Sequence, residues 1–140
     1  MTKPKKRNKA YRPKACVLPL GMRKAVQMEM PGYAASLALG TDWLTEQHIY
    51  DLLSNADMTR RIAPDGHPIL IVAQAMVDAI ATIQRRAQSS KLGVTGDEFR
   101  TLRDGVGKTM DYLRSVPNVA IDRAARAAVA EFNRNGALRV

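Results

Sequence analysis

The sequence predicts an all-α protein, a compact bundle of four to five helices preceded by an extended or disordered basic N-terminal arm. Apolar residues recur at steps of three and four over several long stretches. Proline and glycine separate these stretches, and none of them shows the apolar-polar alternation of a β-strand. We therefore divide the 140 residues into an arm, residues 1–19, and one helical-bundle domain, residues 20–140.

The first helical stretch covers residues 20–39 and is interrupted by Pro31 and Gly32. Pro31 lacks a backbone donor and clashes with the preceding turn, so we expect a kinked helix, with two short helices as the alternative. Gly40 ends this stretch. The apolar positions at helical spacing are Met22, Val26, Met30, Tyr33 and Leu37.

The second helix is expected over residues 42–62, with Thr41 or Asp42 at its N-cap. The turn-forming residues 63–66 end it. Its buried side chains are predicted to be Leu44, Ile49, Leu52, Leu53 and Ala56, together with Trp43 and Met58.

The third helix, residues 68–88, starts with Pro68, which suits the first position of a helix. Apolar residues also lie outside its main seam, at Leu70, Val72 and Val77, so at least two neighbouring helices must cover it. We expect it to be the structural axis of the bundle, and any uncovered strip to be an interface with another copy or a partner. Its seam consists of Ile69, Ala73, Met76, Ile80, Ile83 and Ala87.

Thr95 and Glu98 form a capping box that opens the fourth helix, and Pro117 stops that helix. Its apolar positions are Phe99, Leu102, Val106, Leu113 and Val116. Asn118 is expected to cap the last helix, residues 119–135, which Gly136 closes. The apolar face of that helix is Ile121, Ala125, Ala128, Val129 and Phe132.

Positive charge is concentrated at the start of the chain. Residues 1–24 contain nine Lys or Arg and no acid, so the whole net charge of +9 belongs to this segment. We expect it to bind nucleic acid, with Lys and Arg neutralising phosphates and Tyr11 and Arg12 stacking on an exposed base or sugar. Docking on an acidic protein and an aid to solubility are the alternatives. The candidate residues are Lys3, Lys5, Lys6, Arg7, Lys9, Tyr11, Arg12, Lys14, Arg23 and Lys24.

The last helix provides a secondary basic face formed by Arg123, Arg126 and Arg134. We expect Asp122 to pair with Arg126 and Glu131 to interrupt this face. A recognition helix in the major groove is an alternative, although the preceding helix is longer than in a compact helix-turn-helix.

No pattern in the sequence indicates catalysis. Residues 105–109 (GVGKT) end like a phosphate-binding loop, but Leu102 occupies the position of the required first glycine and no strand precedes it. Gly105 and Gly107 are therefore expected to allow close helix packing. His48 and Glu46 lack the spacing of a di-iron helix, and His67 is expected to serve in a turn or cap. We predict a non-enzymatic protein with no cofactor and no metal site.

The single Cys16 excludes an intramolecular disulfide, and the longest apolar run is far shorter than the roughly 20 residues of a membrane span. The apolar segment 15–22 contains Pro19 and runs into Arg23 and Lys24, unlike a secretory signal. We expect a cytoplasmic protein.

The stretch from Lys5 to Lys14, KKRNKAYRPK, followed by a short apolar link and helical sequence, resembles small uncharacterised proteins encoded by phages and prophages of proteobacteria. The resemblance implies a bacterial host cell and no catalytic residues. It implies a role in binding nucleic acid, in particle assembly, or in blocking host machinery. The alternative to nucleic-acid binding is therefore a protein-protein interaction module that uses the helical body, with the arm steering it to an acidic surface.

Overall fold

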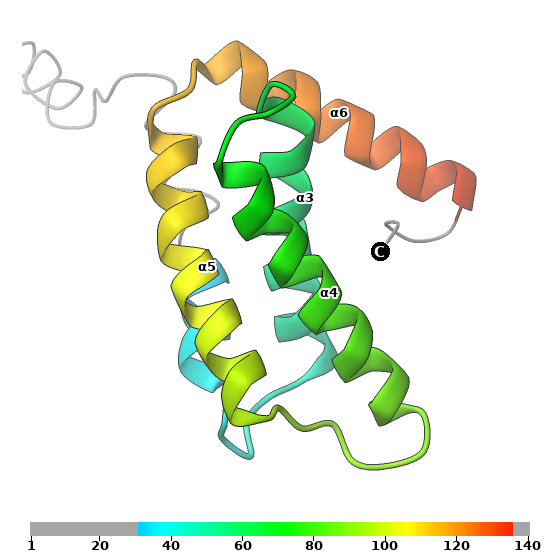
Figure 1. Cartoon of the computed structure of the whole chain (residues 1–140). Coiled ribbons are helices and arrows are strands. Elements are labelled where there is room, and N and C mark those ends of the chain that lie inside the picture. The colour runs from blue at the N-terminus through cyan, green and yellow to red at the C-terminus, as the bar shows by residue number, and fades with distance from the viewer. Residues whose placement is uncertain (1–30, 136–140) are drawn as a thin grey trace, which may run out of the picture.

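The computed structural model describes residues 31–135, which form a short helical segment, 31–38, and four long helices without any strand. The long helices are α3 (Glu46–Ile62), α4 (Ile69–Ala87), α5 (Gly96–Arg114) and α6 (Asn118–Asn135) (Figure 1). The predicted all-α bundle is confirmed for this part of the chain. The arm, the first half of the expected kinked helix and the Gly136 cap lie outside the described residues.

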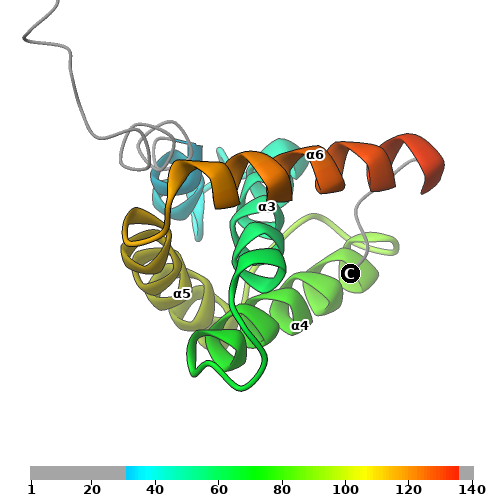
Figure 2. The same cartoon turned by 90° about the horizontal axis from the view of Figure 1, so that it is seen from above.

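Helices α3, α4 and α5 lie side by side, and α6 crosses one end of this group (Figures 1 and 2). Helix α3 packs against α4, α5 and α6, whereas α4 packs against α3 and α5. The structural axis is therefore α3, and the expectation that residues 68–88 form it is wrong. Two neighbours do cover α4, which explains why Val77 is buried along with the seam from Ile69 to Ile83, but Ile71 remains 76% exposed.

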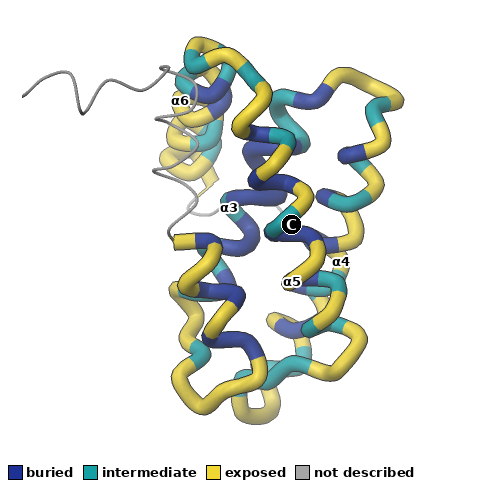
Figure 3. The backbone as a smooth tube through the Cα atoms, turned by 90° about the vertical axis from the view of Figure 1, so that its left-hand side faces the viewer, coloured by how far each residue is buried: buried dark blue, intermediate teal, exposed yellow. Residues whose placement is uncertain are grey.

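The core lies between α3, α4, α5 and the helical segment 31–38 with Leu39 just after it, as the buried positions show (Figure 3). Gly105 is part of this contact because a β-carbon there would lie 2.5 Å from Met76 Cγ and 2.6 Å from its Sδ. The predicted role of Gly105 in close helix packing is confirmed. Gly107 has open space around it and has no such role.

Helix α3 begins four residues later than predicted. Thr45 is its N-cap, and His48 completes a capping box by accepting the Thr45 backbone N–H at Nδ1, 3.1 Å away. Thr41 instead donates to the Ala38 carbonyl and accepts the Trp43 N–H, which makes a turn after Gly40. Trp43 therefore lies in the connection and is 78% exposed, contrary to the prediction that it is buried.

Helix α5 begins at the predicted capping box, with Thr95 Oγ1 accepting the Glu98 N–H and the Glu98 carboxylate accepting the Thr95 N–H. The same carboxylate binds Arg86 at the end of α4, with Nη2 and Oε1 2.6 Å apart. A hydrogen bond from Arg86, opposed by partial burial, lowers the pKa of Glu98. Glu98 thus ties the start of α5 to the end of α4.

Helix α6 differs most from its prediction. It starts at Asn118 itself, whose side-chain Oδ1 is buried without a hydrogen-bond partner, so Asn118 does not cap the helix as expected. Ile121 and Ala124 are buried, whereas Ala125 is exposed and Val129 and Phe132 are 59% and 41% exposed. The reason is that α6 makes its main contact with a single helix, α3, which covers one narrow strip of its surface.

Candidate nucleic-acid interface

The principal nucleic-acid-binding residues predicted from the sequence lie outside residues 31–135. They are Lys3, Lys5, Lys6, Arg7, Lys9, Tyr11, Arg12, Lys14, Arg23 and Lys24. The body that follows is electrically balanced, because residues 31–135 contain twelve Lys or Arg and twelve Asp or Glu. The secondary basic face on α6 is the part of the predicted interface that the structure describes.

Most cations of the described body are already held by neighbouring groups. Six of them form ion pairs with carboxylates: Arg61, Arg86, Lys91, Arg100, Lys108 and Arg114. Arg85 donates to Thr82, and Arg103 lies over the ring of Phe99 with its Cζ 5.0 Å from the centroid. The six ion-paired side chains have little unneutralised charge to offer a ligand.

The three arginines of the predicted face differ from this pattern. Arg123, Arg126 and Arg134 are exposed and form no ion pair with any described residue, so the expected pair between Asp122 and Arg126 is not made. At 100° per residue they fall within an arc of about 80° on the outer side of α6. We call Arg123, Arg126 and Arg134 the α6 arginine strip.

Glu131 does not interrupt this strip as predicted, because it points toward α3. Its Oε2 lies 2.8 Å from Arg61 Nη2, and Arg61 Nε lies 2.7 Å from Asp57 Oδ2. Partial burial opposes protonation of Arg61, but hydrogen bonds and charge from Asp57 and Glu131 outweigh it and raise the pKa of Arg61. Arg61 therefore neutralises Glu131 and fastens α6 to α3.

A hollow of 350 Å³ lies beside this ion pair, between α3 and α6. Arg61 and Arg123 line it from the two helices, and the remaining lining side chains are small or aliphatic: Ile62, Ala120, Ala124 and Ala127. Arg61 uses Nε and Nη2 for its carboxylate partners, which leaves its Nη1 without a hydrogen bond to a described residue. The hollow thus combines two guanidinium groups with room for a small anionic group.

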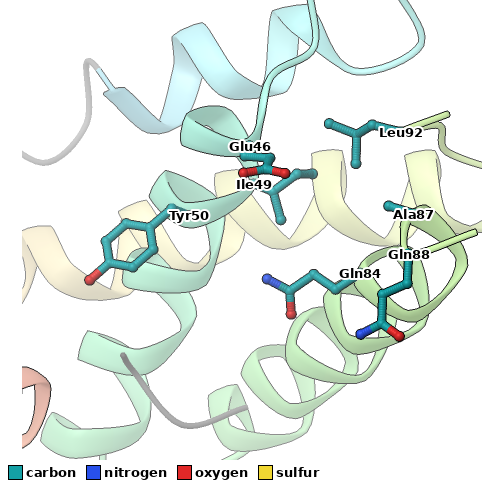
Figure 4. A pocket seen from close by; sticks show the side chains of 7 residues that line it. All are labelled: Glu46, Ile49, Tyr50, Gln84, Ala87, Gln88 and Leu92. Carbon is teal, nitrogen blue, oxygen red and sulfur yellow. The ribbon is translucent and has the colours of Figure 1, made fainter. Parts of the chain in front are cut away.

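A second, apolar groove of 370 Å³ runs along the opposite side of the α3–α6 contact. Its lining residues are Tyr50, Ser54, Asp57, Met58, Ala125, Ala128, Val129 and Phe132. The rings of Tyr50 and Phe132 meet edge to face with their centroids 6.5 Å apart. Tyr50 also borders a neighbouring hollow of 490 Å³ between α3 and α4, which Gln84, Gln88 and Leu92 help to line (Figure 4). The uncovered apolar surface of α6 therefore lines the 370 Å³ groove.

The remaining sequence candidates have structural roles. Lys108 lies within helix α5 and pairs with Asp104 at 2.9 Å, and buried Thr109 donates to the Gly105 carbonyl, so this stretch has no phosphate-binding loop geometry. His67 accepts the Ile69 N–H at Nδ1, 3.0 Å away, at the start of α4, which confirms its predicted role in a turn or cap. No cluster of three potential metal ligands occurs within residues 31–135.

None of the helices in the described part of the chain is both long and apolar enough to cross a bilayer. Comparisons with protein-family models, with curated proteins and with solved structures find no match to this chain.

Two features of the site were missed by sequence reasoning. The contact between Arg61 and Glu131 joins residues seventy positions apart, so no local spacing in the sequence indicates it. The apolar groove was missed because the apolar face of α6 was assumed to be covered. A signal for the groove exists in the sequence of α6, whose many alanines present little side-chain volume to a second neighbouring helix.

Proposed function

We propose that this chain is a non-enzymatic binding protein of the phage or prophage type that contacts nucleic acid through its basic N-terminal arm in the bacterial cytoplasm. The observation that carries the proposal is the separation of charge. The first 24 residues carry nine cations and no acid, while residues 31–135 are balanced and six of their twelve cations form ion pairs. The likeness of residues 5–14 to phage-encoded proteins supports the cellular setting.

A concentrated cationic segment binds phosphates mainly by releasing the counterions that surround them. Each phosphate contact to duplex DNA then adds about 0.9 to the slope of log affinity against log salt concentration. The body has no net charge, so the arm is the largest single source of this term. Affinity should therefore depend on the arm and fall steeply with salt.

The test compares two variants of the full chain that each lose three positive charges. In the first, Lys5, Lys6 and Arg7 become Gln; in the control, Lys91, Arg100 and Lys108, each exposed and beside one carboxylate, become Gln. Fluorescence anisotropy with duplex DNA and single-stranded RNA between 50 and 200 mM salt should show a slope reduced by about 2 to 3 for the arm variant alone. Deletion of residues 2–14 without any change in affinity or salt slope would refute the proposal.

The apolar groove between α3 and α6 favours a second candidate function, a protein-protein interaction module of the helical body. Val129 and Phe132 are too exposed to contribute fully to the core, yet they line a concave surface with Tyr50 and Met58. An amphipathic helix of a host or virion protein would bury this surface. The assay is co-purification after nuclease treatment, in which one stoichiometric protein should be retained by the wild type and lost with Val129→Asp.

A further inference from the structure

The α6 arginine strip is the one place in the described body where several cations lie together without carboxylate partners. Arg123, Arg126 and Arg134 share one side of the helix, and no acid falls between them within that arc. Like charges on one side of a helix repel one another and destabilise the folded state. The stability of the bundle therefore does not account for this arrangement. Its charge is directed outward.

The shape of α6 makes the strip accessible to a long ligand. The helix crosses the end of the bundle and projects past α3, so its outer side faces no other described helix (Figures 1 and 2). Ala127 and Ala130 lie between the arginines, and their short side chains let an extended polymer approach the helix closely. Arg123 and Arg134 are separated by about 16 Å along the axis, the axial length of about five base pairs.

The hollow beside Arg61 lies at the Arg123 end of this strip. Arg123 belongs both to the strip and to the lining of the 350 Å³ hollow, which Arg61 also lines. A guanidinium group binds phosphate oxygens in a planar, two-pronged geometry, which the unpaired Arg123 can offer. Arg61 shares its charge with Asp57 and Glu131 and adds only its Nη1 as a hydrogen-bond donor.

We propose that the α6 arginine strip, with the hollow between Arg61 and Arg123 at one end, is a second binding surface for the phosphodiester backbone of a nucleic acid. The inference extends the proposed function, since the arm and α6 would contact the same strand. The contact is to phosphates and therefore positions the body on the nucleic acid without reading its sequence. Arg123 lies nearest the hollow and Arg134 contacts the strand farther along.

The experiment uses the full chain with Arg123, Arg126 and Arg134 all changed to Gln. The matched control is again the Gln variant of Lys91, Arg100 and Lys108, which removes the same charge from other surfaces. Circular dichroism and thermal melting establish that both variants keep the fold. For duplex DNA the α6 variant should lose at least tenfold in affinity at 50 mM salt, and its salt slope should fall by about 2 to 3. The control should stay within about threefold of the wild type.

Replacing the same three arginines by lysine should restore the salt slope, because the slope counts neutralised phosphates, whereas a structural defect in α6 would not be rescued. An α6 glutamine variant that binds like the control would overturn the inference. Equal displacement of the α6-dependent binding by polyglutamate would also overturn it, because the surface would then be a site for acidic proteins. Loss of binding in the α6 variant but not in the arm variant would refute the arm's role and leave this inference standing.

Discussion

Alanine substitution should have opposite effects on stability at two glycines of the same helix, Gly105 and Gly107. Both sit within α5, where glycine costs about 1 kcal/mol relative to alanine. At Gly107 the added methyl group meets nothing within 4 Å, so Gly107→Ala should raise the free energy of unfolding by up to about 1 kcal/mol. At Gly105 the methyl group would overlap buried Met76.

The cost of that overlap decides the outcome at Gly105. Met76 is fully buried between α4 and α5, so its Cγ and Sδ can move only by displacing other core side chains. Overpacking of this kind costs about 1 to 3 kcal/mol, which offsets or exceeds the gain in helix propensity. Gly105→Ala should therefore be less stable than Gly107→Ala by about 1 to 3 kcal/mol.

Urea unfolding followed by circular dichroism measures both variants on the full chain. The double variant Gly105→Ala with Met76→Ala should be more stable than the sum of the two single effects predicts, because Met76→Ala removes the overlapping atoms. Equal stabilisation by alanine at Gly105 and Gly107 would refute the packing argument. It would also reopen the question of why two glycines occur inside this helix.

Three further outcomes follow from the contacts described above. Arg61→Ala should lower the free energy of unfolding by about 3 kcal/mol, because the buried carboxylate of Asp57, 6% exposed, loses its partner. Lys108→Ala, which breaks an exposed pair, should change the free energy of unfolding by less than about 1 kcal/mol. The folded state lowers the pKa of Glu98, so the ionised carboxylate stabilises the fold fully above the ordinary glutamate pKa. This stabilisation is lost as pH falls through the lowered pKa. The stability gap between wild type and Glu98→Gln in acid titrations should therefore close toward low pH. Trp43→Ala should leave stability within about 0.5 kcal/mol, since Trp43 packs on little, and a larger loss would contradict its exposure.

Local signals in the sequence predicted the helices and several of their ends. The capping box of Thr95 and Glu98 was found because it satisfies backbone groups within four residues of each other. The end of α5 was placed at Pro117, but the helix already ends at Arg114. The start of α3 was misplaced because Thr45 pairs with His48, an imidazole, in a motif that usually has Glu or Gln at that position. Helix type and approximate length therefore follow from sequence, while some boundaries do not.

The position of α6 could not be predicted from its own pattern. Periodicity shows that Ile121, Ala128 and Val129 lie on a broad apolar face, but it does not show how many helices cover that face. The structure places α3 against one edge of it, and the contact of Arg61 with Glu131 holds that register. The α6 arginines are exposed, as their positions outside the apolar face predicted, whereas the hollow that Arg123 shares with Arg61 depends on a tertiary contact.

The attachment of α6 to essentially one neighbour has a consequence for hydrogen exchange. Segments with few buried apolar contacts open independently of the rest of a domain, at a lower free energy than global unfolding. Amide protons in the middle of α6 should therefore exchange faster than those of α4 and α5, which contribute most of the buried core. Bound duplex DNA should slow exchange in α6 selectively, so that this helix becomes a reporter of occupancy while the three-helix core remains unchanged.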